Sequence, residues 1–347
     1  MMILHSIFRR ACKIRKNICK NVYVGMLCTK QSKFCFVTAV RSHSSGSCTD
    51  ITSCCLKDVF EQWTKEFELH KISEPKTSAE IIIAHVLGYK TLYFVDKKYT
   101  TLTTSEINTV NKLCQLRLAR MPVQYVIEEW DFHDLTLKMR PPVLIPRPET
   151  EELASLCTKT FTQTEDMPVR TFLEIGPGTG AISIYLLKTF SKMCGVALDI
   201  SSHACKLTSE NAATVGVSDR LSVMEGDYHL DNVVQQLAKH GPYDLIVSNP
   251  PYITAEEMKN LQPEILWYED HQALDGGPDG LNLIRHIIQS STQLLVKGGH
   301  VWLEVAPQHP TSIQNILNES DCNRKLTLVE VVKDVFGKNR FCHLQYS

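Results

Sequence analysis

The chain has 347 residues, of which 43% are hydrophobic and 22% charged. These values exclude a collagen-like, coiled-coil or wholly disordered protein, and the length suggests about two domains. The formal net charge is −1, but residues 1–49 contain nine of the 37 Lys and Arg and none of the 38 Asp and Glu. The remaining chain therefore has 28 basic and 38 acidic residues, a formal charge of −10. Direct nucleic-acid binding is disfavoured, because phosphate is bound chiefly by clustered Lys and Arg.

The acid-free N-terminal segment ends in the serine-rich run RSHSSGS. This composition is typical of an organelle transit peptide, so we expect residues 1–49 to act in targeting and to stay outside the fold. A disordered basic tail is the alternative. The apolar stretch over residues 22–40 is interrupted by Lys30, Gln31 and Lys33. Because a membrane span needs about 20 mostly apolar residues, we expect no membrane insertion.

Cysteine and histidine are frequent, with 13 of each, but neither shows the spacing of a metal site. No C-x-x-C pair is followed by a second pair, and there is no H-E-x-x-H motif. We therefore expect no metal. The thiols are predicted to be reduced and mostly buried, packing as small hydrophobic groups at Cys157, Cys194, Cys205 and Cys342.

Residues 50–121 are predicted to form a small helical domain, because large apolar side chains recur there at steps of three and four. These side chains are Leu56, Phe60, Trp63 and Phe67. Capping-box spacing predicts two helix starts, at Thr77 with Glu80 and at Thr103 with Glu106. Residues 123–140 then alternate apolar and polar positions, which indicates a pair of strands within a linker over residues 122–148.

The last part of the chain, residues 149–347, alternates short apolar runs with helical stretches from residue 170 onward. The predicted strands are RTFLEI, GVALDI, LSVMEG, YDLIVS, GHVWLEV, LTLVEVV and RFCHLQY. This alternation predicts a mostly parallel sheet covered by helices on both faces. Only KDVFGKN separates the last two strands, too few residues for a crossover helix, so these two must pair antiparallel. We therefore predict a Rossmann-like, seven-stranded, doubly wound α/β sheet.

A glycine-rich loop follows the first of these strands, and a helix follows the loop. Glycines let the backbone approach a ligand closely, and the helix N-terminus offers free N–H groups. The spacing is G-x-G-x-G, without the G-x-G-x-x-G of dinucleotide sites, so we favour a methionine carboxylate and a ribose over a pyrophosphate as the ligand. The predicted contacts are Gly176, Pro177, Gly178, Thr179 and Gly180.

Acidic residues end the next two strands at the same edge of the sheet. Asp199 can accept hydrogen bonds from both hydroxyls of a ribose, although a helix-capping role is the alternative. Asp227 and Tyr228 can hold an adenine by a hydrogen bond and by stacking. An exposed loop Asp and a half-buried Tyr is the alternative interpretation of that pair.

The segment Asn249-Pro250-Pro251-Tyr252 follows the fourth strand at this edge. Proline carbonyls accept hydrogen bonds although proline nitrogens cannot donate them. The Asn249 side-chain oxygen and a proline carbonyl can grip both hydrogens of a planar NH2 group, while Tyr252 packs on its face. Such a grip directs a poorly nucleophilic nitrogen at a methyl donor by positioning and electrostatics. A rigid proline turn is the alternative.

Residues 55–346 resemble the HemK/PrmC release-factor glutamine methyltransferases, and specifically the mitochondrial members of that family. The resemblance rests on LIPRPETE, EIGPGTGAI, SNPPYI and YEDHQALDGGPDGL. It implies a class I methyltransferase fold, S-adenosylmethionine as the cofactor, and methyl transfer to the glutamine of a Gly-Gly-Gln motif in mitochondrial peptide chain release factors. Asn249 is then expected to contact the cofactor as well. Tyr228 stands where relatives often have Trp, and Glu128 where they usually have Gly.

The resemblance further implies location in the mitochondrial matrix, and we expect a monomer. Two alternatives stay open at this point. One is an adenine amino-methyltransferase acting on DNA or RNA, because the same Asn-Pro-Pro-Tyr grip suits an adenine amine. The other is a non-catalytic S-adenosylmethionine-binding module that docks on a translation factor.

Overall fold

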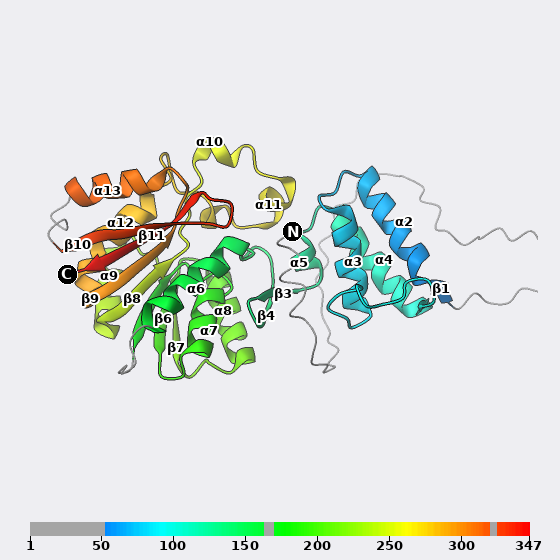
Figure 1. The fold of residues 1–347 in the computed structure, drawn as a ribbon, viewed down its shortest axis with the longest axis horizontal. Helices are drawn as coiled ribbons and strands as arrows, with labels where there is room; N and C mark the ends of the chain where they lie inside the picture. The colour runs from blue at the N-terminus through cyan, green and yellow to red at the C-terminus, as the bar shows by residue number, and fades with distance from the viewer. Residues whose placement is uncertain (1–52, 163–169, 320–324) are drawn as a thin grey trace, which may run out of the picture. The chain divides into compact units, whose positions relative to one another are not determined.

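The computed structural model describes residues 53–162, 170–319 and 325–347 (Figure 1). The predicted targeting segment, residues 1–49, lies outside these ranges. The described chain forms two compact units, one extending to Lys112 and the other from Leu113 to Ser347. Within the described ranges, no helix is both long and apolar enough to cross a membrane.

The first unit is helical, as predicted. It contains α2 (Leu56–Leu69), α3 (Pro75–Val86) and most of α4 (Thr104–Leu118). The four apolar residues that recur along α2 are all at most 8% exposed, because they share the face that packs into the core of this unit. A short antiparallel pair, β1 (Ser53–Cys55) with β2 (Thr101–Thr103), was not predicted.

One of the two predicted helix starts is confirmed. The Thr103 backbone N–H donates to Glu106 Oε2 at 2.8 Å, and the Glu106 N–H donates to Thr103 Oγ1 at 3.3 Å, which is a reciprocal capping box. The start predicted at Thr77 is wrong, because α3 already begins at Pro75. Proline is well suited to the first helical turn, since its missing N–H would have no partner there.

The segment that was predicted as two strands is only partly extended. Val123–Val126 forms the short helix α5, and the strands β3 (Glu129–Phe132) and β4 (Leu135–Lys138) pair antiparallel after it. Glu128 separates helix from strand with φ 59°, in the left-handed region that favours glycine. Glu128 therefore adopts a backbone conformation that glycine would adopt more easily.

The seven-stranded sheet of the second unit is confirmed. Its strands are β5 (Thr171–Ile175), β6 (Cys194–Asp199), β7 (Leu221–Glu225), β8 (Tyr243–Ser248), β9 (Leu295–Glu304), β10 (Leu326–Lys333) and β11 (Asn339–Tyr346). They are ordered β10-β11-β9-β8-β5-β6-β7. The strands β5 to β9 pair parallel with one another, and β11 pairs antiparallel with both β9 and β10.

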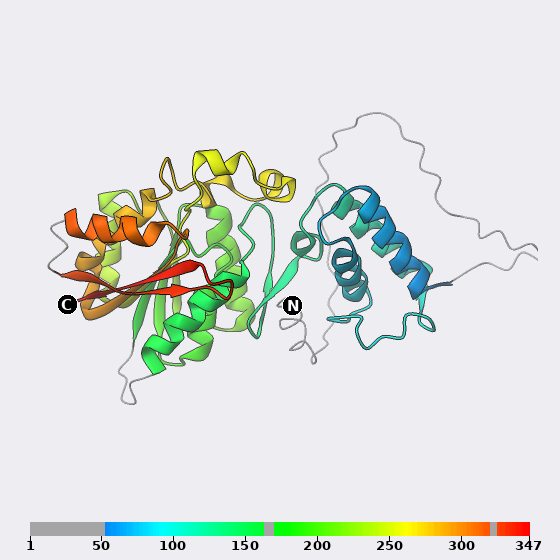
Figure 2. The ribbon, with the colours of Figure 1, turned by 45° about the horizontal axis from the view of Figure 1, so that its top comes forward.

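Helices cover both faces of this sheet (Figures 1 and 2). One core joins alternate strand residues to α6 (Pro148–Thr162), α7 (Ala181–Thr189) and α8 (Ser202–Val215). The opposite core joins the intervening strand residues to α9 (Asp231–His240), α12 (Asn282–Leu294) and α13 (His309–Glu319). The short helices α10 (Ala255–Met258), α11 (Pro263–Tyr268) and η1 (His271–Ala273) lie in the long connection after β8.

The cysteines of the described residues are free thiols. Cys157 and Cys342 are buried, as predicted, and burial raises the pKa of the Cys342 thiol to about 12. The prediction is wrong for Cys194, which is exposed because it stands at the first position of β6, before the strand enters the core.

Replacing Glu128 by glycine should stabilise the protein. The left-handed conformation costs an L-residue about 1–2 kcal/mol, and glycine avoids this cost while its greater freedom in the unfolded chain offsets part of the gain. We expect Glu128→Gly to raise the free energy of unfolding by about 1 kcal/mol in urea denaturation. The matched change Glu129→Gly, inside β3, should lower it instead. Equal effects of the two variants would contradict this account.

Candidate functional site

A cavity of about 330 Å³ opens where the parallel strands end, between the loops that follow β5, β6, β7 and β8. The sequence predicted this edge, and seven of the predicted residues line the cavity: Gly176, Gly178, Asp199, Asp227, Tyr228, Asn249 and Pro251. The other predicted residues are not in its lining: Pro177, Thr179, Gly180, Pro250 and Tyr252. These five belong to the same two loops as Gly176, Gly178, Asn249 and Pro251.

The glycine loop is held in place by hydrogen bonds from its backbone N–H groups to residues of the neighbouring strand β6. The Gly176 N–H donates to the Leu198 carbonyl at 2.8 Å, and the Gly178 N–H donates to Asp199 Oδ2 at 3.1 Å. Gly180 precedes α7 with φ 82°, and a Cβ there would lie 3.0 Å from Thr208 Cγ2. Glycine is therefore favoured at this position by its backbone conformation, and the space for a Cβ is tight.

Asp199 ends β6 and faces the cavity. Its second oxygen, Oδ1, accepts a hydrogen bond from the Ser201 N–H at 2.9 Å, so the carboxylate joins the glycine loop to the start of the next helix. Burial raises the pKa of Asp199, while the N–H groups of Ser201 and Gly178 oppose this shift. The helix-capping alternative is wrong, because the N-cap of α8 is Ser201 and no side chain of the described residues caps this helix, whereas Asp199 lines the cavity.

Asp227 and Tyr228 line the same cavity from the loop after β7. Asp227 accepts a hydrogen bond from the His229 N–H at 2.9 Å, and this bond is the main reason why the pKa of Asp227 is lowered. The Tyr228 hydroxyl lies 2.7 Å from Ser290 Oγ, and its ring meets His286 edge-on with 5.4 Å between centroids. These contacts keep a carboxylate and an aromatic ring in defined places beside the cavity.

The Asn249 side chain lies in a defined orientation at the end of β8. Its Nδ2 donates to Thr150 Oγ1 at 3.1 Å. Within the described part of the chain, no group donates a hydrogen bond to its Oδ1, which leaves this oxygen as an acceptor. The Tyr252 hydroxyl donates to Glu304 Oε1 at 3.3 Å, so the last residue of the loop is held at its polar end.

Sequence reasoning assigned no role to two segments that also form the cavity. Val143 and Leu144 line it, together with Asp270, Gln272, Ala273, Asp275, Asn282 and Leu283. The two segments are joined to each other, because the Asp270 N–H donates to the Pro142 carbonyl at 2.7 Å and Arg147 pairs with Glu269. The two runs LIPRPETE and YEDHQALDGGPDGL are distinctive in the sequence and could have indicated these segments. Only the folded chain shows that both lie at the cavity.

The second of these segments packs directly beneath the Asn-Pro-Pro-Tyr loop. The Ile253 N–H donates to the Leu274 carbonyl, and the Gly276 N–H donates to the Ile253 carbonyl, both at 2.9 Å. A Cβ on Gly276 would lie 2.8 Å from both the Pro251 carbonyl oxygen and Tyr252 Cα. The loop can therefore keep its position only while residue 276 has no side chain.

The charges of the cavity lining suit a cationic ligand. Four carboxylates line it, those of Asp199, Asp227, Asp270 and Asp275, and none of the described lining residues is Lys or Arg. S-adenosylmethionine has a sulfonium and an ammonium group, and the loop N–H groups and carboxylates match its polar ends, so these residues fit that cofactor. Within the described ranges, no group of three or more His, Cys, Asp or Glu could hold a metal ion.

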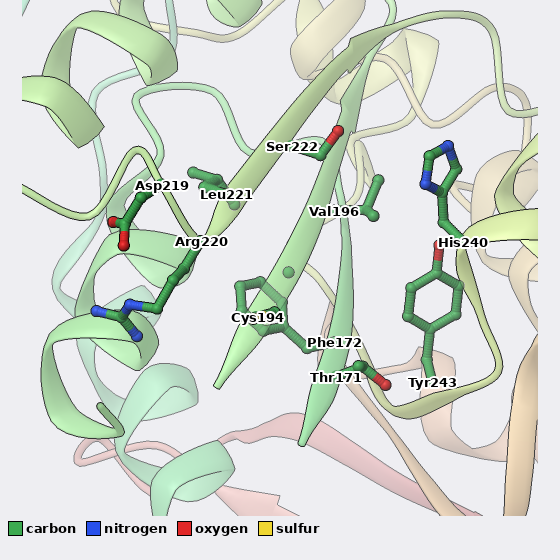
Figure 3. Close-up of a pocket in the computed structure, with 11 residues that line it drawn as sticks. Thr171, Phe172, Cys194, Val196, Asp219, Arg220, Leu221, Ser222, His240 and Tyr243 are labelled. Atoms are coloured by element: carbon green, nitrogen blue, oxygen red, sulfur yellow. The ribbon is translucent and has the colours of Figure 1, made fainter. Parts of the chain in front are cut away.

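A second hollow of about 310 Å³ lies at the opposite edge of the sheet (Figure 3). Its lining comes mainly from the amino ends of β5 to β8, with Thr171, Cys194, Leu221 and Tyr243 among the residues. Ligands of open α/β sheets bind at the carboxyl ends of the strands. None of the predicted site residues lines this hollow.

Comparisons with known proteins point to one family. A model described as the PrmC N-terminal domain matches residues 58–127, and one described as the methyltransferase small domain matches residues 154–277. The human MTRF1L release factor glutamine methyltransferase is 40% identical, over 84% of this chain and 87% of the relative. Release factor glutamine methyltransferases of Thermodesulfovibrio yellowstonii and Chlorobaculum tepidum are 32% and 33% identical. They are matched over 80% and 73% of this chain and 95% and 86% of their own.

A methyl group added at Gly276 should disturb the loop above it. We expect Gly276→Ala to lower the free energy of unfolding by about 1–3 kcal/mol, because the backbone of the neighbouring loop must move to admit the new Cβ. Urea denaturation measures this change. The control is Gln272→Ala, a truncation of an exposed side chain in the same segment, which should stay within about 0.5 kcal/mol of the parent. Parent-like stability of Gly276→Ala would show that the packing is looser than described.

Proposed function

Because the chain belongs to the release factor glutamine methyltransferases, we propose that it methylates mitochondrial peptide chain release factors. The methyl group passes from S-adenosylmethionine to the side-chain amide nitrogen of the glutamine in their Gly-Gly-Gln motif. The observation that supports this most directly is the orientation of Asn249, whose Nδ2 is bound to Thr150 while its Oδ1 stays available beside the cavity.

The proposed chemistry depends on holding the substrate amide. Asn249 Oδ1 and a carbonyl of Pro250 or Pro251 accept the two N–H groups of the glutamine, and Tyr252 packs against the plane of the amide. Accepting both hydrogens directs the nitrogen lone pair away from the amide carbonyl and limits the rotation of the group. When bound, the cofactor would supply the electrophilic methyl group: as the N–CH3 bond forms, the S–CH3 bond breaks, S-adenosylhomocysteine leaves as a neutral thioether, and the nitrogen loses one of its two protons to water. No triad or metal is required for this transfer.

The cofactor is proposed to lie in the cavity between the glycine loop and the Asp270 segment. Gly176, Pro177, Gly178, Thr179 and Gly180 form the loop at its methionine end. Asp199 accepts the ribose hydroxyls, Asp227 and Tyr228 hold the adenine, and Asn249 stands between cofactor and substrate. Six of these nine residues line the cavity, Gly176, Gly178, Asp199, Asp227, Tyr228 and Asn249, and the others continue the same loop.

The parts of the chain are proposed to divide the work. Residues 50–121 recognise the release factor, residues 122–148 link the two domains, and residues 149–347 bind the cofactor and transfer the methyl group. Residues 1–49 direct import into the mitochondrial matrix. The enzyme acts as a monomer and without direct contact to nucleic acid, which agrees with the formal charge of −10 after residue 49.

Methyl transfer should depend on Asn249 more than cofactor binding does. We expect Asn249→Ala to slow single-turnover methylation of a Gly-Gly-Gln release factor by about a hundred- to a thousandfold, because one preorganised acceptor is lost. Mass spectrometry of the factor, with its glutamine replaced by alanine as the negative control, measures the product. Transfer by the parent to an adenine amine only, or to no acceptor at all, would overturn the proposed function.

Asp199→Ala provides the reciprocal control. It removes the acceptor of the Gly178 and Ser201 N–H groups and the proposed partner of the ribose. We expect S-adenosylmethionine binding to weaken by about 1.5–3 kcal/mol in calorimetry, whereas Asn249→Ala should change it much less. Equal losses of cofactor affinity in the two variants would make Asn249 chiefly a cofactor residue.

Import should depend on the basic N-terminal segment. A fusion of residues 1–50 to a fluorescent reporter is expected to enter mitochondria, since nine Lys or Arg without any acidic residue up to position 49 match a transit peptide. The matched control replaces Arg9, Arg10, Lys13, Arg15 and Lys16 by Gln, which should leave the reporter in the cytosol. A reporter that stays cytosolic with the parent segment would contradict the assignment.

A further inference from the structure

We infer that Thr150 and Glu304 are positioning residues, which set the direction of the Asn249 side-chain amide and hold Tyr252 through one buried carboxylate. The inference rests on the proposed function, because it concerns how the amide grip is made ready for its substrate. Neither residue touches the cavity directly. They act through Asn249 and Tyr252, the side chains proposed to hold the substrate amide.

The fold brings three separate segments together at this point. Ser248 of β8 stands opposite Leu303 of β9 in the parallel register, so Asn249, which follows β8, and Glu304, the last residue of β9, lie at the same level. Thr150 lies in the first turn of α6. Both Glu304, at 1% exposed, and Thr150, at 5%, are shielded from water.

The hydrogen bonds form an ordered chain. Thr150 Oγ1 donates to Glu304 Oε2 at 2.9 Å, and Asn249 Nδ2 donates to Thr150 Oγ1 at 3.1 Å. A hydroxyl has one hydrogen, and an ionised carboxylate can only accept. The Thr150 hydrogen is therefore committed to Glu304, and its oxygen must accept from Asn249. This forces the NH2 group of Asn249 toward Thr150 and leaves Oδ1 for the substrate.

The other oxygen of the same carboxylate holds the second gripping residue. The Tyr252 hydroxyl donates to Glu304 Oε1 at 3.3 Å, which anchors the ring by its polar end. A single buried carboxylate thus orients both the amide acceptor and the aromatic face. Glutamine at position 304 could not accept from both hydroxyls, because its side chain has one acceptor oxygen and its NH2 group only donates.

The protonation state of Glu304 should therefore determine how the Asn249 side-chain amide is oriented. The pKa of Glu304 is raised to about 7, chiefly by burial and to a smaller extent by the charge of Glu149 on α6. The hydroxyls of Thr150 and Tyr252 and the charge of Arg340 on β11 act in the opposite direction. Arg340 is itself paired with Asp334, at 3.3 Å between Nε and Oδ2.

Once protonated, Glu304 can donate to Thr150, and the Thr150 hydrogen becomes free to turn toward Asn249. The amide of Asn249 can then flip and present its NH2 group to the substrate. The NH2 group of the substrate glutamine also donates, so the two groups cannot form a hydrogen bond. A carboxyl with a pKa of about 7 gains charge as pH rises through 7. Single-turnover methylation should accordingly rise between pH 6 and 8 and then become constant.

The first test compares two threonines of α6 that face β9. Thr160 accepts a hydrogen bond from Trp302 of β9 at 2.9 Å, so Thr160→Val removes the same group from the same helix–strand contact away from the site. We expect Thr150→Val to slow single-turnover transfer at least about tenfold with unchanged S-adenosylmethionine affinity, Thr150→Ser to restore the rate, and Thr160→Val to match the parent. Equal losses in both valine variants, or none in Thr150→Val, overturn the inference.

The second test uses Glu304→Gln, which keeps the size of the side chain but removes its titration. Its transfer rate should be at least about tenfold below the parent rate at pH 8 and should no longer change between pH 6 and 8. A parent-like rise of the rate with pH in this variant would exclude Glu304 as the titrating group. If the parent protein transfers no methyl group, the proposed function is overturned instead. A third measurement then still tests whether Thr150 and Glu304 orient Asn249.

That measurement is nuclear magnetic resonance of protein labelled with ¹⁵N at asparagine, which needs no activity. The Asn249 side-chain NH2 signal is assigned by its absence in Asn249→Ala. We expect this signal to shift with a midpoint near pH 7 in the parent, and to lose this shift in both Glu304→Gln and Thr150→Val but not in Thr160→Val. A signal that ignores pH in the parent, or titrates alike in all variants, overturns the inference.

Discussion

Parallel pairing of β5 with both β6 and β8 is the constraint on which the site depends. The chain leaves β5 through α7 on one face, whereas the helices that precede and follow β8 cover the other. The loops after these strands diverge above β5, and a crevice forms between them. The glycine loop, Asp199 and Asn249 reach this crevice because each directly follows or ends one of the three strands.

The same edge contains two buried carboxylates. Glu174 in β5 accepts from the Ser183 N–H at 2.9 Å and so holds the first turn of α7, while Glu304 at the end of β9 holds Thr150 and Tyr252. Burial raises the pKa of each to about 7. Burying a carboxylate is unfavourable for folding unless hydrogen bonds compensate it. Here the compensating bonds order the first turn of α7, just after the glycine loop, at one strand and the Asn-Pro-Pro-Tyr loop at another.

Close packing supplies the remaining order. Gly276 and Gly280 admit the backbone of Tyr252, since a Cβ at these positions would lie 2.8 Å from Tyr252 Cα and 2.4 Å from its carbonyl oxygen. The Asn-Pro-Pro-Tyr loop is thus packed against a segment that follows it by more than twenty residues. The glycines of the DGGPDG run therefore serve the packing of the Asn-Pro-Pro-Tyr loop.

The sequence by itself determined the sheet and the edge that bears the site. Hydrophobic runs of strand length, glycine spacing and chain order are local signals, and the parallel arrangement follows from them. It did not reveal α5, which has only four residues, or the start of α3 at Pro75, because the capping-box spacing of Thr77 with Glu80 pointed to a later residue. Tertiary structure alone decided that Thr150 and Glu304, 154 residues apart, share a hydrogen bond next to Asn249. Such a contact depends on strand register and helix packing, and these are set by the whole core rather than by any segment of the chain.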